Sequence, residues 1–268
     1  MTDYIEISKE LRKKVVKIKH DSQSGHLGSA LSCVDILNVL YFKVLNIDPK
    51  NSLKEDRDWF IFSKGHAAAA LYAVLCQRSF FPESELAECV NGSKIAGHSV
   101  KDSFPGIEVS TGSLGHGFPM ANGMALSAKK DGKQHRIFVM ISDGECDEGT
   151  TWESALFASH NQLDNLTVII DYNKVQSFGM VDEVMKLEPL ASKWESFGFN
   201  VQEIDGHNFE ELEKAFAVVK ERNGKPNVII CHTTKGKGIK EMENTVESHY
   251  HKVTNEEHTK FIEEIEKL

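Results

Sequence analysis

Short apolar runs alternate with amphipathic stretches along most of the chain. Largely apolar runs predict buried strands at Trp59–Phe62, Arg136–Ile141 and Leu166–Asp171, and two more strand candidates are Asn200–Ile204 and Val228–Cys231. Helical periodicity or high helix propensity predicts helices at Ile5–His20, Ser32–Leu45, Ala67–Cys76, Pro119–Lys130 and Thr150–His160. Pro82 opens a further helix, and Thr254 with Glu257 predicts the capping box of a last one. Strands and helices are therefore expected in alternation.

This alternation indicates the α/β class, with a mostly parallel sheet flanked by helices on both faces. No repeat, low-complexity block or linker interrupts the pattern, so residues 1–268 are predicted to form a single domain. Open sheets of this kind bind ligands beyond the carboxyl ends of their strands. The loops after Phe62, Ile141, Asp171 and Cys231 are therefore expected to carry chemistry, as is the long Gly- and His-rich stretch Ile95–Gly117.

Composition excludes several other classes of protein. Hydrophobic residues make up 40% of the chain and charged residues 26%, which is typical of a globular domain and not of a disordered tail. The formal net charge of −9 argues against a nucleic-acid binder. No apolar run approaches the ~20 residues of a membrane span, and Met1–Lys9 lacks the apolar stretch of a signal peptide. The five widely spaced cysteines predict free thiols in a reducing cytoplasm.

Acidic and amide side chains follow two of the predicted strands. Asp143 and Gly144 come directly after one buried strand, and Asn173 follows the next. Side chains at the ends of two neighbouring strands can converge on one hard cation, and Mg²⁺ takes oxygen ligands from protein, phosphate and water. The alternative is that Asp143 and Asn173 are only turn residues, since both types are favoured in turns.

The same residues resemble the thiamine-diphosphate motif, in which a Gly-Asp-Gly and a downstream Asn hold Mg²⁺ and a diphosphate; here Ser142 replaces the first glycine. Flanking segments extend the likeness to the transketolase family in family order over nearly the whole chain. They are Ser24-Gly25-His26, Ser63-Lys64-Gly65-His66, Gly97-His98, Thr111-Gly112-Ser113-Leu114-Gly115-His116-Gly117, Glu148-Gly149, Trp152-Glu153, Asp205-Gly206-His207, Thr233-Thr234-Lys235-Gly236 and Ser248-His249.

The resemblance implies a role for each matching position. The metal, Mg²⁺ or a substitute such as Ca²⁺ or Mn²⁺, would be held by Asp143, Asn173 and the carbonyl of Val175. The cofactor contacts would be His66, Gly112, Ser113, Leu114, Gly144, Glu145 and His249, in addition to Asp143 and Asn173. The catalytic histidines of the substrate channel would be His26, His66, His98 and His249.

Two assignments stay open at this stage, that of Glu153 and that of His249. Glu148 and Glu153 match acidic residues that lie between the two cofactor sites of the family dimer. Glu153 could also close a capping box with Thr150. His251 lies close enough to His249 in the sequence to compete for its role.

Transketolases are more than twice this length, and the chain resembles only their first, diphosphate-binding domain. The resemblance therefore implies the N-terminal subunit of a split transketolase, completed by a C-terminal pyrimidine-binding subunit in an α2β2 heterotetramer. Such an enzyme moves a two-carbon ketol unit from a ketose, by default a sugar phosphate of the pentose phosphate pathway, to an aldose. The alternative substrates are a sulfosugar and a sugar acid. The alternatives are a deoxyxylulose-phosphate-synthase-like or 2-oxoacid-dehydrogenase-like subunit, and a non-catalytic binding partner. The full set of histidines favours transketolase, and intact Asp143 and Asn173 argue against the non-catalytic alternative.

Overall fold

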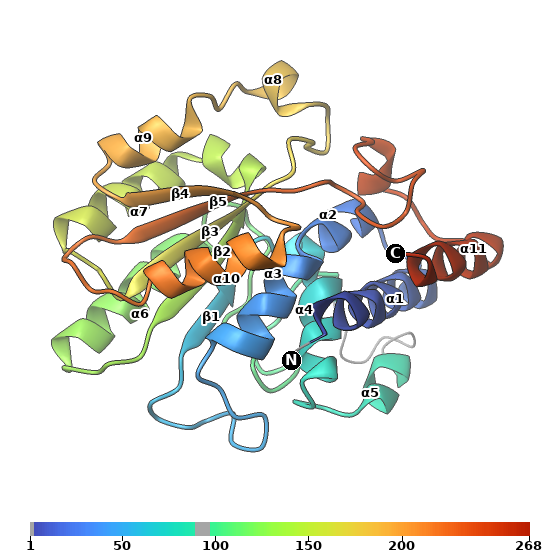
Figure 1. Ribbon diagram of the computed structural model, residues 1–268, viewed down its shortest axis with the longest axis horizontal. Coiled ribbons are helices and arrows are strands. Elements are labelled where there is room, and N and C mark those ends of the chain that lie inside the picture. Colours follow the sequence, from blue (N-terminus) through green and yellow to red (C-terminus); the bar gives the residue numbers. More distant parts are fainter. Residues whose placement is uncertain (1–2, 89–96) are drawn as a thin grey trace.

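The computed structural model describes residues 3–88 and 97–268 and is built on one sheet of five parallel strands (Figure 1). In spatial order the strands are β1 (Trp59–Phe62), β2 (Ile137–Ser142), β3 (Leu166–Tyr172), β5 (Asn227–His232) and β4 (Asn200–Asp205). All four neighbouring pairs run parallel. The predicted α/β class and all five predicted strands are therefore confirmed, with boundaries that shift by at most one residue.

Helices follow the strands as the alternation predicted. They are α1 (Tyr4–Ser22), α2 (Leu27–Ser32), α3 (Val34–Val39), α4 (Ala68–Gln77), α5 (Glu83–Glu88), α6 (Gly117–Lys130), α7 (Gly149–His160), α8 (Val181–Val184), α9 (Leu190–Ser196), α10 (Phe209–Val218) and α11 (Asn255–Glu266). A π-helical turn, Leu40–Val44, extends α3, and a 3₁₀ turn, Gly65–Ala67, precedes α4. The predicted capping box of Thr254 with Glu257 begins α11.

The helix predicted at Ser32–Leu45 starts earlier than expected and is interrupted at Cys33. Helical structure begins at Leu27, inside the segment Ser24–Gly28, whose two glycines predict a loop. At Gly28, α2 packs so closely against the chain near Ser248 that a Cβ would collide with the Ser248 hydroxyl. This glycine therefore allows close packing and does not mark a turn.

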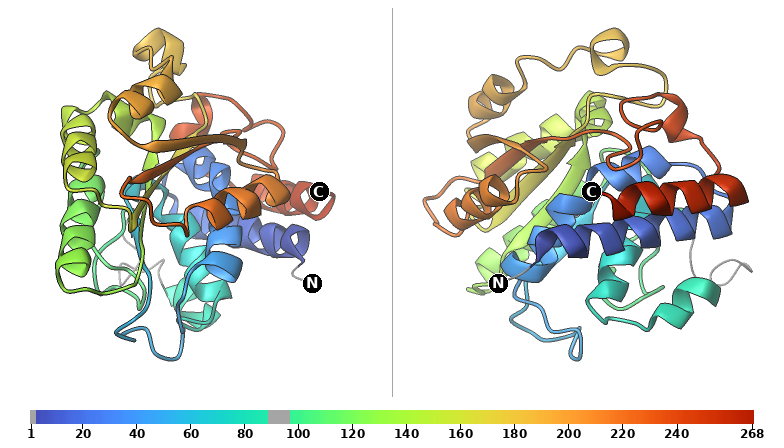
Figure 2. Two further views of the ribbon diagram at one scale, coloured as in Figure 1. Left: turned by 60° about the vertical axis from the view of Figure 1, so that its left-hand side comes forward. Right: turned by 45° about the vertical axis from the view of Figure 1, so that its right-hand side comes forward.

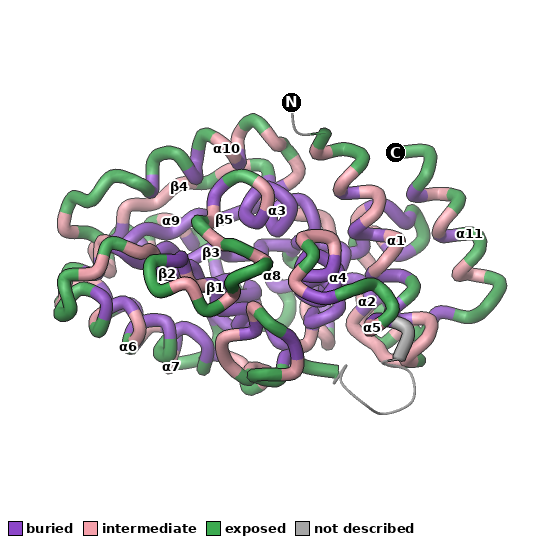
Figure 3. The backbone as a smooth tube through the Cα atoms, turned by 90° about the horizontal axis from the view of Figure 1, so that it is seen from below, coloured by how far each residue is buried: buried purple, intermediate pink, exposed green. Residues whose placement is uncertain are grey.

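The sheet is the middle of three layers (Figure 2). Alternate residues of each strand enter different apolar clusters, as the two-residue period of a strand requires. Phe60, Phe138 and Ile229 face the layer of α1–α4, α10 and α11, whereas Val139 and Ile170 face α6, α7 and α9. Figure 3 shows a buried centre that contains β1, β2, β3 and β5, whereas the edge strand β4 and the outer turns of the helices are intermediate or exposed. Helices on both faces confirm the second half of the fold prediction.

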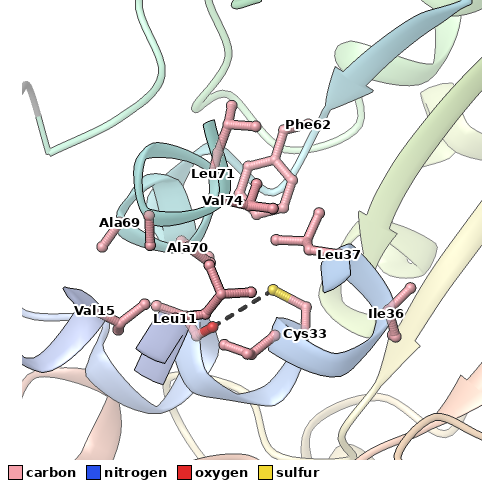
Figure 4. Packing of buried hydrophobic residues seen from close by; sticks show 14 of the residues in the cluster. Leu11, Val15, Cys33, Ile36, Leu37, Phe62, Ala69, Ala70, Leu71 and Val74 are labelled. Atoms are coloured by element: carbon pink, nitrogen blue, oxygen red, sulfur yellow. Dashed lines mark hydrogen bonds between the residues drawn. The ribbon is translucent and has the colours of Figure 1, made fainter. Parts of the chain in front are cut away.

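The larger cluster joins α1, α3 and α4 to one face of β1 (Figure 4). Leu11, Leu37 and Phe62 from three different elements meet there and are almost fully buried. The Sγ of Cys33 lies 3.6 Å from the Ala30 carbonyl oxygen, so this thiol serves as a weak donor within the core. The described cysteines Cys33, Cys76, Cys146 and Cys231 are buried free thiols; Cys89 lies outside the described residues.

Among the described residues, no helix combines the length and the apolar character that crossing a bilayer would require.

Candidate functional site

A cavity of about 400 Å³ opens at the carboxyl ends of the strands. Its walls come from the loops after β1, β2 and β3, from the segments that precede α2 and α6, and from the turn before α11. Most of the residues singled out from the sequence line it: His26, His66, His98, Gly112, Leu114, Asp143, Gly144, Glu148, Asn173, Val175 and His249. Residues more than 200 positions apart are thus brought to the edge of the sheet where ligands were expected.

Asp143 is held rigidly in the cavity wall. The residue is 3% exposed, and each carboxylate oxygen accepts a backbone N–H: Oδ1 from Gly144 at 2.8 Å and Oδ2 from Lys174 at 2.8 Å. Burial, reinforced by the nearby Asp171 carboxylate, raises the pKa of Asp143 to about 6. A buried carboxylate without a cationic partner of its own is costly, and a cation at this point would relieve that cost.

Asn173 and Val175 face the same cavity from the loop after β3. Asn173 Oδ1 accepts the Val175 N–H at 3.1 Å, and its amide group lies 3.4 Å from Asp171 Oδ2. Between them Lys174 adopts a left-handed conformation with φ of 67°, which gives this loop its tight turn. The Val175 carbonyl accepts a hydrogen bond from Lys235 Nζ at 2.9 Å.

The oxygen atoms of these residues suit a hard cation that also binds a phosphate group. Asp143, Asn173 and Val175 offer one carboxylate, one amide oxygen and one carbonyl oxygen. Within the described ranges, no group of three or more His, Cys, Asp or Glu side chains is arranged to hold a metal. A magnesium ion usually takes only one or two carboxylates from protein and completes its shell with phosphate and water. The residues present therefore suit a metal–diphosphate unit better than a protein-only metal cage.

Glu145 lies behind the cavity wall, although the resemblance places it among the cofactor contacts. It is fully buried and accepts hydrogen bonds from the Ser63 hydroxyl, from Gly115 N at 3.1 Å and from Ser142 N at 2.9 Å. One carboxylate thus ties together the loops after β1 and β2 and the loop before α6. This arrangement makes Glu145 an organiser of the loops that surround the cavity.

Ser113 and Glu153 are exposed and do not line the cavity, whereas Glu148 stands exposed at its edge. The alternative in which Glu153 closes a capping box with Thr150 is wrong, because α7 begins at Gly149 and its N-cap residue is Glu148. Glu153 therefore projects from the first turns of α7 into solvent.

Four histidine rings surround one side of the cavity. The His26 ring lies 5.4 Å from His66, 6.0 Å from His98 and 4.9 Å from His249, measured between ring centroids. The His26 backbone, with φ of 70°, donates its N–H to the His249 carbonyl, which fixes two of these residues to each other. His251 points elsewhere: its Nε2 lies 3.1 Å from Glu257 Oε1 at the start of α11. Of the two candidates, only His249 reaches the cavity.

Three of these histidines, His26, His66 and His249, have lowered pKa values and are neutral near physiological pH. Burial first, and nearby lysines and histidines second, lower the pKa of His26 to about 4 and that of His249 to about 3. The same causes lower the pKa of His66 well below its usual value. Neutral imidazoles can both donate and accept hydrogen bonds, so the cluster suits the binding of hydroxyl groups and the transfer of protons.

These shifts predict how the stability of the ligand-free chain depends on pH. Because the folded-state pKa values are depressed below the unfolded value of ~6.5, the unfolded chain binds more protons between about pH 6.5 and 4. We therefore expect the free energy of unfolding to fall as the pH is lowered from about 6.5 to 4, by at most about 1.4 kcal/mol per pH unit for each histidine. Urea unfolding at successive pH values would measure the slope. His26→Gln should flatten it, and an unchanged slope in that variant would contradict the assignment.

Sequence reasoning assigned no role to Lys235, Ser29 and Gln176, which the structure places at this site. Lys235 is fully buried after β5, and its Nζ reaches the Val175 carbonyl at 2.9 Å, the Gln176 carbonyl at 3.1 Å and His249 Nδ1 at 3.2 Å. The sequence position of Lys235 could have indicated this, since the residue follows a strand at the same edge of the sheet as Asp143. Ser29 and Gln176 line the cavity but follow no recognisable spacing.

Beneath the cavity lies a fully buried ion pair. Lys64 Nζ contacts Asp171 Oδ2 and the Ser29 carbonyl at 3.0 Å, while Asp171 also accepts hydrogen bonds from the Ser32 and Thr233 hydroxyls. Burial alone would raise the pKa of Asp171, but Lys64 and these hydroxyls hold it below its usual value. The pair therefore links β3 to the loop after β1, to α2 and to the loop after β5.

Comparison with known proteins agrees with this geometry. Residues 5–265 match the family model described as "Transketolase, thiamine diphosphate binding domain". The chain is 44% identical over 248 residues to an apulose-4-phosphate transketolase subunit from Actinobacillus succinogenes, covering 92% of this chain and 89% of that one. It is 43% identical over 245 residues to a 6-deoxy-6-sulfo-D-fructose transketolase subunit from a Clostridium species, covering 91% and 89%.

Solved structures give the same result. Transketolase from Leishmania mexicana superposes with a TM-score of 0.92 at 28% identity, and that from Campylobacter jejuni with 0.88 at 33%. These alignments cover 99% and 98% of this chain but only 42% of each transketolase chain. The chain therefore belongs to the transketolase family and corresponds to the thiamine-diphosphate-binding domain of that family.

Proposed function

We propose that this chain is the diphosphate-binding subunit of a transketolase built from two kinds of subunit. It would bind thiamine diphosphate together with Mg²⁺, or with Ca²⁺ or Mn²⁺ in its place, and transfer a two-carbon ketol unit from a ketose to an aldose. The observation that carries this proposal is the meeting of Asp143 and Asn173 with four histidines in one cavity. Relatives of similar length are named as transketolase subunits, which supports the two-subunit arrangement.

The cofactor-binding wall combines a cation site with hydrogen-bond donors. Asp143, Asn173 and the Val175 carbonyl would hold the metal. Gly144 leaves the backbone open for close approach of a diphosphate, since a Cβ there would make only ordinary contacts, with the Gln176 side chain at 3.8 Å and the Ser142 hydroxyl at 4.0 Å. Gly112, with φ of 149°, lies against the His98 ring, so a side chain at this position would displace that ring. His66 and Leu114 complete the wall.

Thiamine diphosphate, when bound, supplies the electron sink that makes the bond beside a ketose carbonyl breakable. The residues of this chain would handle hydroxyl groups and protons around that bond. Lys235 donates to His249 Nδ1, which leaves the hydrogen on His249 Nε2 to be donated to a ligand oxygen. His26 and His98 line the neighbouring walls and would hold substrate hydroxyls and exchange protons with them.

A partner subunit would supply the rest of the active site. We propose a separate C-terminal subunit with a pyrimidine-binding domain, joined in an α2β2 heterotetramer, with Glu148 and Glu153 near the contact between cofactor sites. Two surfaces of this chain support an assembly. Phe178, which is 84% exposed, stands at the mouth of the cavity, and Leu156, 59% exposed, projects from α7 beside Glu153. Phe178 is accompanied at the cavity by the exposed Val184, and Leu156 is followed by the exposed Phe157, and exposed apolar side chains grouped in this way mark protein contacts.

The substrate is proposed by class. A sugar phosphate or related ketose, including a sulfosugar, fits because the two relatives described above are named for apulose 4-phosphate and 6-deoxy-6-sulfo-D-fructose. The histidines of this chain would contact the part of the sugar near the reacting bond, so the distal group would be bound mainly by the partner. A role in pentose phosphate metabolism in the cytoplasm is part of the same proposal.

Calorimetric titration of thiamine diphosphate into the complex with a cognate C-terminal subunit tests the proposal. Binding is expected with Mg²⁺ present and is expected to disappear in EDTA. A coupled assay would then offer ketose phosphates and 6-deoxy-6-sulfo-D-fructose as donors, with an aldose phosphate as the acceptor. Metal-independent binding, or ketol transfer from none of these donors, would contradict the proposal.

A further inference from the structure

A buried polar network joins three elements on the side of the Lys235 loop away from the cavity. Arg12 of α1 makes a two-pronged pair with Asp35 of α3, with Nη1 2.9 Å from Oδ1 and Nη2 2.7 Å from Oδ2. His207, which follows β4, reaches the same carboxylate through Nδ1 at 2.7 Å. Arg12 is 3% exposed and Asp35 is 4% exposed. None of the three lines the cavity described above.

The other ring nitrogen of His207 identifies its tautomer. The Thr234 backbone N–H donates to His207 Nε2 at 2.9 Å, so that nitrogen is an acceptor without a hydrogen. Nδ1 must then carry the hydrogen and donate it to Asp35. Burial alone would raise the pKa of Asp35, but the Arg12 guanidinium and His207 hold it well below its usual value. A neutral histidine therefore bridges a buried carboxylate and a backbone amide.

The network contacts the loop after β5 at two points. His207 accepts the N–H of Thr234, and Arg12 Nε donates to the Lys237 carbonyl at 3.1 Å. Lys235 lies between these two points and extends to the cavity side, where it bonds the Val175 carbonyl and His249. The loop is thus held from behind by Arg12 and His207, while its central lysine supports the cavity wall.

We propose that His207, oriented by the Arg12–Asp35 pair, is a positioning residue that sets the Lys235 loop against the cavity. Without His207 the Thr234 amide loses its acceptor, and the loop can move away from Val175 and His249. The consequence for ligand binding rests on the proposed function, but the effect on the loop does not. The motif Asp205-Gly206-His207 is thereby given a task beyond shaping a turn.

The first test uses the full-length chain without cofactor. Amide hydrogen exchange of residues 233–238 is expected to rise on the order of tenfold or more in His207→Phe, since an amide–acceptor bond to a charged network is lost. His207→Gln, whose side-chain carbonyl can accept the Thr234 N–H, should restore much of the protection. His135→Phe, a half-buried histidine before β2 at the opposite end of the sheet, is the matched control and should leave this loop unchanged.

A spectroscopic readout keeps the proposal testable even if His207→Phe fails to fold. In the unmodified chain, ¹⁵N–¹H correlation spectra should show His207 as the neutral tautomer with hydrogen on Nδ1. The opposite tautomer, or unchanged exchange of the loop in a folded His207→Phe, would overturn the proposal. In the complex, His207→Phe should weaken thiamine diphosphate binding on the order of tenfold, and His207→Gln should recover it. Absence of cofactor binding in the unmodified complex would instead refute the proposed function and leave the exchange result valid.

Discussion

Replacing Asp143 with asparagine or alanine is expected to abolish Mg²⁺-dependent binding of thiamine diphosphate to the complex. The dissociation constant should rise at least about a hundredfold, because the loss of a mere outer-shell partner of a metal already costs ~10–100-fold. Asp143 supplies the only carboxylate of the proposed metal set, and its two oxygens are already oriented by Gly144 and Lys174. Titration calorimetry with and without Mg²⁺ would measure the effect.

The same substitution should not prevent folding. Burial raises the pKa of Asp143 to about 6, so the charged form is disfavoured in the ligand-free fold, and asparagine removes that charge while keeping an acceptor. Asp131→Asn, an exposed carboxylate after α6, is the control and should bind the cofactor normally. Normal cofactor binding by a folded Asp143→Asn protein would refute the metal assignment.

The second large effect concerns the diphosphate-binding chain on its own. We expect the purified chain to show ketol transfer at least about a thousandfold below that of the two-subunit complex, since a positioned acid or base alone contributes ~10²–10⁴-fold. The resemblance to transketolases implies that the glutamate that activates the cofactor lies in their second domain, which this chain does not resemble. A continuous assay with increasing amounts of the C-terminal subunit would measure the dependence.

Activity should rise as the C-terminal subunit is added and should saturate when the two are present in equal amounts. A C-terminal subunit whose activating glutamate is replaced by glutamine should still form the complex but leave it inactive, which separates assembly from chemistry. Full turnover by this chain without any partner would refute the two-subunit proposal.

The strands β1, β2, β3 and β5 were predictable because each is a short, largely apolar run buried on both sides, whereas the edge strand β4 is polar in part and only half-buried. Val139 and Ile170 sit in the middle of such runs, and the sheet needs nothing more specific at those positions. Helix boundaries were less predictable, because tertiary packing overrides local signals. Gly28 indicated a loop, yet it lies inside α2 where the neighbouring chain leaves no room for a side chain. No local pattern contains that information.

The site likewise contains residues whose roles could be predicted from the sequence and residues whose roles could not. Asp143 and Asn173 were found because a strand end and a short motif identify them, and both line the cavity. Glu145 lies in the same motif, but only the folded chain shows that its carboxylate accepts hydrogen bonds from Ser63, Gly115 and Ser142 and does not line the cavity. Whether a side chain faces a ligand or faces its own loops depends on contacts between distant segments, which spacing along the chain does not contain.

The antiparallel pairing of α1 with α11 has a practical consequence for handling the protein. Lys9 Nζ bonds the Glu266 carbonyl at 3.3 Å, and the His20 ring, at the other end of α1, lies 2.7 Å from Asn255. His26 comes shortly after this end of α1 and His249 shortly before this end of α11, so the cavity histidines lie beyond the second end of the pair. Affinity tags, fluorescent fusions or surface tethers attached at either terminus would therefore project from the end of the helix pair remote from the cavity, and a short linker between the termini should permit circular permutation.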